Sequence, residues 1–521
     1  MLSLRADGMN YSLLSGLDRY SLWNSTPLRV VGGLMVTLAL VLLFPALYAM
    51  SCNEDASIFL LPIPFLLVFG IVMCLIFGPS SNFRTVHGLI LVGMVWVEMF
   101  IIAALPFLLG GMTPLDAFFE SVSCITTTGI TMVVDVNDWP ESLMVWRSMC
   151  QWMGGIAVVI IFIYILPMFG MGRMFFSNEL EGSGSSQFSM KLRNAAKSFI
   201  IVYLSLTIVN FVLLILVQAS FVDALCLALT TISTGGLLVS NTSLMNSGLW
   251  IQIITMVFMF IGGVNFYLHY KAIYGKRPRV YLENSELKFF ALWLIVMSVV
   301  VYLINIWPLM DTGTLDFEDS LEEYKNSLFT VISFGTTSGF VAFDHSLYPE
   351  ITMFALILIM LVGGSAGSTS GGIKFGRIRV LIRFFHNSLK NVLHPNAVYA
   401  VKIDGETIDD HRVISAVSVT LLYVLTTLIA IVVLLACGMS WIDSFGVAVG
   451  TITNTGAAFG NYGPTGTFAF LSAPVKLFLM LLMWIGRLEI TLALVFLTPT
   501  FWRDVRFSLR ASRKGTHIKK N

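Results

Sequence analysis

The sequence predicts an all-α polytopic membrane protein built from four repeats, each with two membrane spans and a half-length helix between them. Its composition is the first observation: 56% of the 521 residues are hydrophobic and 12% are charged, whereas soluble domains carry about 25% charged residues. A motif that occurs four times is the second. Its shared glycines, which lie 107, 103 and 117 residues apart, are Gly129, Gly236, Gly339 and Gly456.

Each copy of the motif predicts a short helix that ends in a Thr/Ser/Gly segment. Ten residues, Ala117–Thr126 in the first copy, would form a helix of about 15 Å, which is half of a bilayer core. The residue that stands thirteen positions before each glycine is Asp or Asn, a strong N-cap, because its side chain accepts a hydrogen bond from the first helical turn. These predicted N-caps are Asp116, Asp223, Asn326 and Asp443.

The segments that end in the shared glycines are candidates for the lining of a pore. Irregular backbone at membrane depth must be buried in protein or line water. Four helix C-termini that converge would favour a cation through their dipoles, and backbone carbonyls can replace a cation's hydration shell. We therefore predict four repeats around a pseudo-fourfold pore; the alternative is four ordinary turns between membrane helices.

Apolar stretches place ten spans around these segments. Two spans stand outside the repeat, at 28–50 and 57–78. The repeats hold spans at 88–110 and 143–170, 197–219 and 248–274, 286–307 and 350–384, and 413–437 and 474–501. The predicted divisions are residues 1–87 (tail and two extra spans), 88–196, 197–285, 286–412 and 413–521 (the four repeats, the last with a basic tail).

Charge predicts the orientation of the chain. The loops that follow each second span are basic, whereas the loops on the motif side are mostly acidic. Because positive loops stay in the cytoplasm, both termini are expected there, and the motifs should open outward. Acidic outer loops would also concentrate cations, although ordinary solvated loops explain these charges equally well.

A glycine-rich segment interrupts the second span of the third repeat. GGSAGSTSGG (363–372) holds five glycines and cannot form a stable membrane helix. We expect it to hang below the pore lining as a flexible gate, with Lys374 and Arg377 directly after it. The alternative is a simple kink between two half-helices. The glycines assigned to the gate are Gly363, Gly364, Gly367, Gly371 and Gly372.

Two charges lie within the last predicted span. Arg487 and Glu489 are far from either end of 475–501, and such residues usually face a bundle interior or water. Since positions i and i+2 do not face each other on a helix, separate partners are expected. Arg487 could act as a barrier to cations and hold the gate loop; the alternative is a structural ion pair. Glycines of the second spans (Gly154–Gly155, Gly262–Gly263, Gly363–Gly364, Gly486) predict close packing under the pore lining.

These motifs resemble one known family. SVSCITTTG, ISTGG, GTTSGF and TNTGAAFG are similar to the four filters of the TrkH/KtrB potassium-uptake subunits. WMGG, FIGGVNFYLHY, GGSAGSTSGGIK and GRLEI resemble that family's second spans, intramembrane loop and final helix. The resemblance covers about residues 28 to 502, and the two leading spans look more like the TrkH branch than like KtrB.

The resemblance implies potassium uptake across the bacterial inner membrane and a gate formed by the loop with Lys374 and Arg487. It also implies a homodimer and a cytoplasmic TrkA-like subunit that binds the regulatory nucleotide, while this chain binds no cofactor. Each filter has one shared glycine, and Asn454 replaces threonine in the fourth, so selectivity over sodium is expected to be less sharp than in tetrameric channels. The residues implied to coordinate potassium are Thr127, Thr128, Gly129, Thr234, Gly235, Gly236, Thr337, Ser338, Gly339, Asn454, Thr455 and Gly456.

Other function classes remain to be weighed. A symporter that couples potassium to protons or sodium would usually show inverted repeats and paired membrane carboxylates. Here the repeats run in parallel, and we place only one carboxylate, Glu489, deep in a span. An enzyme is not expected, since no zinc motif, Ser/His/Asp set or phosphate loop is present. The net charge of +1 gives no reason to expect a nucleic-acid partner.

Overall fold

The structure, a computed structural model, describes residues 23–78, 85–165, 185–312, 316–394, 396, 399–464 and 466–506. The chain divides into two compact units: unit 1 comprises Met1–Ser121, Tyr164–Met190 and Thr491–Asn521, and unit 2 comprises Val122–Ile163 and Lys191–Ile490. This division does not follow the predicted repeat boundaries, which stay a prediction. The end of the predicted span 143–170 and most of both termini lie outside the described residues.

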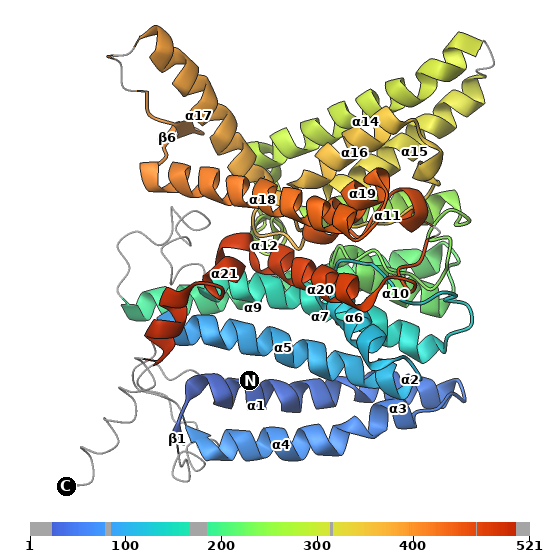
Figure 1. The fold of residues 1–521 in the computed structure, drawn as a ribbon, viewed down its shortest axis with the longest axis vertical. Helices are drawn as coiled ribbons and strands as arrows, with labels where there is room; N and C mark the ends of the chain where they lie inside the picture. Colours follow the sequence, from blue (N-terminus) through green and yellow to red (C-terminus); the bar gives the residue numbers. More distant parts are fainter. Residues whose placement is uncertain are drawn as a thin grey trace. The chain divides into compact units, whose positions relative to one another are not determined.

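Unit 1 holds the two leading spans. The first combines α1 (Thr26–Val41) and α2 (Leu43–Ser51), and the second combines α3 (Ser57–Leu60) and α4 (Pro62–Ile76). Helices α1 and α4 run side by side (Figure 1) because Gly32 and Gly70 face each other; a β-carbon on either would lie closer than 3.0 Å to the other's carbonyl oxygen. Short parallel strands β1 (Trp23–Asn24) and β2 (Phe77–Gly78) join the ends of this pair, and α5 (Thr85–Leu109) packs against α1.

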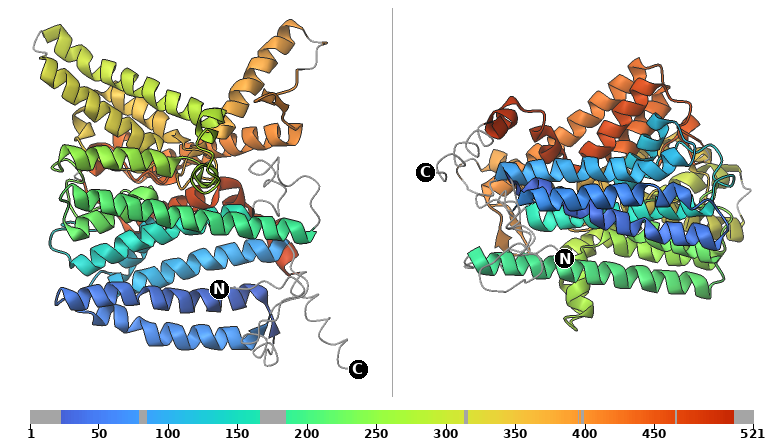
Figure 2. Two further views of the ribbon diagram at one scale, coloured as in Figure 1. Left: turned by 180° about the vertical axis from the view of Figure 1, so that it is seen from behind. Right: turned by 90° about the horizontal axis from the view of Figure 1, so that it is seen from below.

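The remaining helices and strands follow the predicted order of span, intervening helix and span, but the intervening helix of the third repeat has 19 residues and is not the short helix predicted. Figure 2 shows α14 and α15 lying side by side within unit 2, whereas α17 and α18 diverge from one another although they are in contact. The elements are α6 (Pro114–Ile125), α7 (Glu141–Ile165), α9 (Ser185–Leu216), α10 (Phe221–Ile232), α11 (Leu249–Gly263), α12 (Phe266–Ile273), α13 (Val280–Glu283), α14 (Ser285–Thr312), α15 (Phe317–Gly335), α16 (Glu350–Leu361), β3 (Val362–Gly363), β4 (Ile373–Lys374), α17 (Phe375–Leu393), β5 (Lys402–Ile403), β6 (Glu406–Thr407), α18 (Asp410–Ala436), α19 (Trp441–Ile452), α20 (Ala473–Leu488) and α21 (Ile490–Val495).

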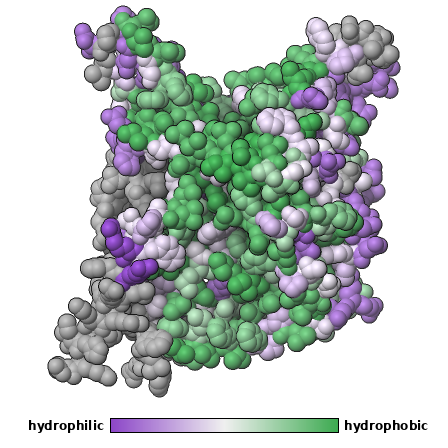
Figure 3. All heavy atoms as spheres, viewed as in Figure 1, coloured by the Kyte–Doolittle hydropathy of each residue, from purple (hydrophilic) through white to green (hydrophobic). Residues whose placement is uncertain are grey.

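The protein is an all-α polytopic membrane protein, as predicted. Among the described residues, seven helices are long and apolar enough to cross a membrane, or eight if one bent pair is counted as a span. Large apolar side chains are exposed on these helices, such as Ile295 on α14 and Val432 on α18. Figure 3 shows hydrophobic residues along the visible flanks of the helices and hydrophilic residues gathered near helix ends. Such flanks suit contact with lipid.

Two predicted continuous spans are broken, and a third is interrupted where expected. The span 248–274 is bent by 103° between α11 and α12. The span 474–501 ends its first helix at Leu488, because Glu489 has a φ of 67° and cannot continue a right-handed helix. The span 350–384 is interrupted between Leu361 and Phe375, where the glycine-rich segment was predicted to prevent a helix.

The predicted N-caps of the short helices are wrong by three residues or more. Ser220 caps α10 and Ser440 caps α19; each hydroxyl accepts from the backbone N–H of the aspartate three residues later. Thr113 makes the same bond to Asp116 at the start of α6. Asn326 lies inside α15, which begins at Phe317 with Asp316 as its N-cap. The signal that sequence reasoning missed is the Ser/Thr-x-x-Asp pattern, a form of capping box.

Replacing Ser220 with alanine should lower the free energy of unfolding by about 1 kcal/mol, the usual cost of losing an N-cap. The midpoint of detergent-induced unfolding of the purified protein measures this change. Thr37→Ala is the matched control, since that hydroxyl only donates to Gly33 O inside α1. Equal losses in the two variants would show that Ser220 contributes nothing as a cap.

Candidate functional site

The four helices that precede the shared glycines, α6, α10, α15 and α19, end in the same backbone motif. The residue two positions before each shared glycine has a left-handed φ of 53° to 56°. In the first copy, Thr127 N–H donates to Cys124 O and Thr128 N–H to Ser123 O, at 3.0 and 2.9 Å. This pair of bonds is the Schellman motif that ends many helices. In the other three copies the donors of the equivalent pairs are the N–H groups of Thr234 and Gly235, Thr337 and Ser338, and Asn454 and Thr455.

Threonine is an unusual residue for this position. A β-branched residue with positive φ is rare, and each such residue costs about 1–3 kcal/mol. Three threonines adopt it here, while Asn454 adopts it at lower cost because asparagine tolerates the left-handed region. Strain that recurs at four equivalent positions indicates that the backbone there is held for a function rather than for local stability.

The four segments close into a ring. The shared glycine of each copy lies against the carbonyl oxygen of the middle residue in the next copy, so closely that an added β-carbon would be nearer than 3.0 Å to that oxygen. The contacts run from the first copy to the second, third and fourth, and back to the first. They are Gly129 with Gly235 O, Gly236 with Ser338 O, Gly339 with Thr455 O, and Gly456 with Thr128 O.

Hydroxyl pairs support three of the four segments. Thr126 and Thr128 share a hydrogen bond of 2.8 Å, and so do Thr336 and Ser338; Thr453 and Thr455 share one of 2.7 Å. The second copy cannot make this pair, because glycine stands at position 235. Asn454 also ties the fourth copy to the first, since its Nδ2 donates to Thr128 Oγ1 at 2.9 Å.

Glycines of three of the four second spans pack against the ends of these helices, as predicted, whereas Gly363 and Gly364 of the third repeat lie against Gly371 O and Gly263 O. A β-carbon on Gly154 or Gly486 would lie closer than 3.0 Å to the carbonyl oxygen of Ile125 or Ile452. On Gly262 it would lie 3.2 Å from Ile232 O. These three isoleucines are the last residues of α6, α10 and α19, so small residues let the second spans approach equivalent points of the ring.

The glycine-rich loop lies directly against the ring. Gly371 N–H donates to Thr337 Oγ1 at 2.7 Å. Thr369 Oγ1 donates to Ile232 O at 3.0 Å, or alternatively to Gly262 O at 3.1 Å. The loop therefore touches the second and third copies through hydrogen bonds, and Gly371 also packs against Thr453 of the fourth.

The loop is held at both ends and does not hang free, contrary to the expectation from sequence. Its flanks pair as parallel strands β3 and β4. Ala366 N–H donates to the Glu286 carboxylate at 3.1 Å, and Gly367 O accepts from Phe266 N–H at 3.2 Å. Gly367 and Gly372 have φ of 78° and 67°, which requires glycine. Glycine here serves a defined buried conformation rather than disorder.

Within unit 2, the loop contacts the bend between α11 and α12. Asn265 caps α12 by accepting from Tyr267 N–H at 2.9 Å, and Phe266 makes the bond to Gly367 described above. His269 stabilises the bend, because its Nε2 lies 3.0 Å from Ile261 O and its Nδ1 lies 2.8 Å from the Tyr281 hydroxyl. The sequence analysis assigned no role to this histidine, although it lies within the quoted motif FIGGVNFYLHY.

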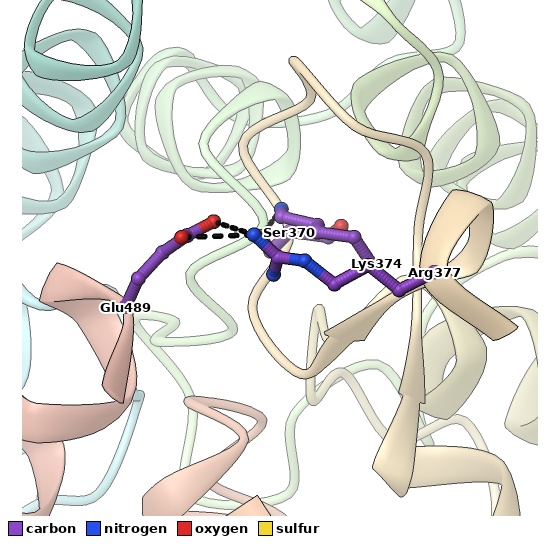
Figure 4. A network of polar contacts seen from close by, with 4 residues as sticks. All are labelled: Ser370, Lys374, Arg377 and Glu489. Atoms are coloured by element: carbon purple, nitrogen blue, oxygen red, sulfur yellow. Dashed lines mark hydrogen bonds and ion pairs between the residues drawn. The ribbon is translucent and has the colours of Figure 1, made fainter. Parts of the chain in front are cut away.

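Arg487 and Glu489 have separate partners, as predicted. Arg487 is 4% exposed and donates from Nη1 to Thr369 O at 2.7 Å, so it does hold the loop. Glu489 forms a two-point ion pair with Arg377, at 2.8 and 2.9 Å (Figure 4), and Lys374 donates to Ser370 O. Glu489 therefore forms the structural ion pair that was considered as the alternative, and its partner is Arg377.

A cavity of about 20 Å³ lies beside these charges. Its lining includes Ser370, Lys374, Arg377, Arg487 and Glu489, together with Tyr423 of α18. A space of this size holds one or two waters. It is too small for a hydrated cation.

A second membrane carboxylate corrects the sequence analysis. Glu98 lies near the middle of α5 in unit 1, is 6% exposed, and neither of its carboxylate oxygens has a hydrogen bond to a described residue. Glu489, in contrast, follows the end of α20. The statement that only Glu489 lies deep in a span was wrong, and one of the arguments against a symporter is weakened.

Comparison with known proteins supports the family resemblance. The TrkH family, described as cation transport proteins, matches residues 65–503. The Trk system potassium uptake protein TrkH of Vibrio parahaemolyticus is 31% identical over 490 residues, which cover 92% of this chain and 99% of that protein. TrkH of Escherichia coli K12 is 27% identical, with 91% and 99% covered.

The fold is also similar to that of a solved structure from the same family. The crystal structure of the potassium transporter TrkH from Vibrio parahaemolyticus superposes with a TM-score of 0.82 at 29% identity, covering 91% of this chain and 98% of that one. Both the sequence match and the fold extend over nearly the whole chain. The protein therefore belongs to the TrkH family of cation transport proteins.

Proposed function

We propose that this chain carries potassium into the cell through the ring formed by its four filter segments, the three residues that end in each shared glycine. The single observation that supports this is the closed cyclic contact of each shared glycine with the next segment's carbonyl oxygen. Main-chain oxygens at such a ring can replace the water around a monovalent cation. The names of the relatives supply potassium as the ion.

The glycine-rich loop and Arg487 would form the gate of this pathway. The loop is hydrogen-bonded to the end of α10 and to the third filter segment, and Arg487 places a buried positive charge on it. A positive charge in a narrow passage opposes cations. Opening would require the Arg487 bond to Thr369 O to break and the loop to leave its site.

The membrane and partner assignments follow the family resemblance. We place the chain in the bacterial inner membrane with both termini in the cytoplasm, as a homodimer with a TrkA-like cytoplasmic subunit that binds nucleotide. The basic loops predicted on the cytoplasmic side would suit such a partner, although topology alone also accounts for them.

Flux through purified protein in lipid vesicles tests this proposal. Potassium uptake should exceed sodium uptake under equal gradients, and should respond to addition of the cytoplasmic subunit with nucleotide. Vesicles that contain protein with the ring disrupted serve as the control. Equal background flux of both ions, with and without the partner, would overturn the proposal.

Potassium–proton symport is the second candidate, and Glu98 favours it. A buried carboxylate within a membrane span marks a functional site by default, and proton relays use such residues. If uptake is coupled to protons, an imposed proton gradient should drive potassium accumulation and Glu98→Gln should abolish that coupling. Uptake that follows the potassium gradient alone, with or without Glu98, would exclude this candidate.

A further inference from the structure

Gln151 on α7 forms a hydrogen bond to a backbone oxygen of the second filter segment. Its side chain is buried, and its Nε2 donates to Gly235 O at 2.6 Å. Gly235 O is one of the four carbonyl oxygens that form the contacts between copies. Among the described residues, the equivalent oxygens of Thr128, Ser338 and Thr455 accept no hydrogen bond. The four ring oxygens are therefore not equivalent, because one of them, Gly235 O, already accepts a hydrogen bond from a side chain of the protein.

The missing side chain at position 235 makes room for this contact. In the other copies a threonine or serine stands at the middle position and pairs with a hydroxyl two residues earlier. A β-carbon on Gly235 would lie closer than 3.0 Å to the Gln151 carboxamide, the nearest group to it. Gln151 thus takes the space that a hydroxyl side chain fills elsewhere, and it meets the backbone with a donor.

Neighbouring contacts hold α7 in this position. Arg147, one turn before Gln151, is 2% exposed and donates to Leu238 O after the second filter segment. Its Nη1 also reaches Thr131 Oγ1 after the first segment, at 3.3 Å. Residues four apart lie on one helix face. One face of α7 therefore spans the junction of the first two copies and presents Gln151 to it.

We propose that Gln151 is a specificity-determining residue that weakens the field of one ring oxygen and so favours the larger cation. This inference rests on the proposed function of the ring as the ion path. A carbonyl that accepts a hydrogen bond offers less negative charge to an ion, and selectivity depends on the number and field strength of the coordinating carbonyls. A weaker field favours potassium, since sodium has the higher cost of dehydration and needs stronger ligands.

Gln151→Met is the test variant, because methionine keeps an unbranched side chain of similar size without the donor. The ratio of potassium to sodium flux in vesicles should fall about fivefold, the change expected from the loss of one ordinary hydrogen bond. Gln252→Met is the matched control: Gln252 is also buried, and its Nε2 donates to Leu244 O at 3.0 Å, which is not a ring oxygen. That variant should keep the wild-type ratio.

A second variant rebuilds the missing hydroxyl. In Gly235→Ser combined with Gln151→Ala, the serine hydroxyl can pair with Ser233, as the hydroxyls do in the other three copies. The ring oxygen then has no donor from α7, so the flux ratio should fall as it does for Gln151→Met. A rise above wild type in either variant would contradict the proposed direction.

Ion-dependent thermal stability gives a readout that does not need transport. The midpoint of unfolding of wild-type protein should rise more in potassium than in sodium, and Gln151→Met should reduce that difference while Gln252→Met keeps it. If Gln151→Met leaves both the flux ratio and the stability difference unchanged, the inference is overturned. If wild-type protein distinguishes the two ions in neither measurement, it is the proposed function that fails.

Discussion

Replacing Gly456 with alanine is expected to reduce potassium uptake to the background of protein-free vesicles. Gly456 has a φ of 71°, and a β-carbon there would lie closer than 3.0 Å to Thr128 O, a backbone atom of the first filter segment. A backbone atom cannot rotate away as a side chain can, so the contact that closes the ring must open. Uptake of a potassium tracer into vesicles measures the loss.

Alanine substitutions at two other glycines serve as controls that distinguish the loss of the ring contact from the effect of backbone strain alone. Gly438 has a similar φ of 88° but has no atom within 4 Å of an added β-carbon; Gly438→Ala should cost about 1 kcal/mol of stability and keep uptake. Gly248, which also has open space, should tolerate alanine. If Gly456→Ala transports as well as these controls, the ring contact is not part of the ion path.

The second large effect is expected from Arg487→Ala, which should raise flux without altering the preference between ions. Arg487 donates a charge-assisted bond to Thr369 O and contributes a positive charge beside the loop. Such bonds contribute about 1.5–3 kcal/mol, so their loss should raise the open population about tenfold to a hundredfold. Tracer flux for potassium and sodium, measured without the cytoplasmic subunit, records both quantities.

Arg379→Ala is the control for charge, because Arg379 forms a partly exposed pair with Asp404 at 3.3 Å and lies outside the loop. Its flux should match wild type. Deleting Gly367–Gly371 should act like Arg487→Ala, since both remove the block while the ring stays in place. Unchanged or lower flux in folded protein of both variants would exclude the loop as a gate.

Local patterns were enough to predict much of the fold. Aligning the four shared glycines identified four equivalent residues two positions earlier, and all four have the same left-handed backbone conformation. Glycine and threonine constraints act within a few residues, so they can be read from the chain itself. The interrupted span at 362–374 was predictable for the same reason, because five glycines in ten residues oppose a helix.

Features that depend on partners far along the chain could not be predicted in this way. The bend between α11 and α12 depends on a loop about a hundred residues later, through the bond from Phe266 N–H to Gly367 O. Glu489 was interpreted as part of a continuous helix, although its bond to Arg377 joins residues 112 apart and Glu489 lies at the break between α20 and α21. Gln151 carried no motif, since its partner is a backbone oxygen.

The sequence by itself determined that the chain is a membrane protein with four equivalent helix endings, because composition and turn geometry are local properties. Only the tertiary structure decided that these endings meet in a closed cycle, that the loop is bonded against them, and that one oxygen of the cycle has a donor behind it. Each of those results depends on distances between residues that are distant in sequence, and a one-dimensional pattern does not contain such distances.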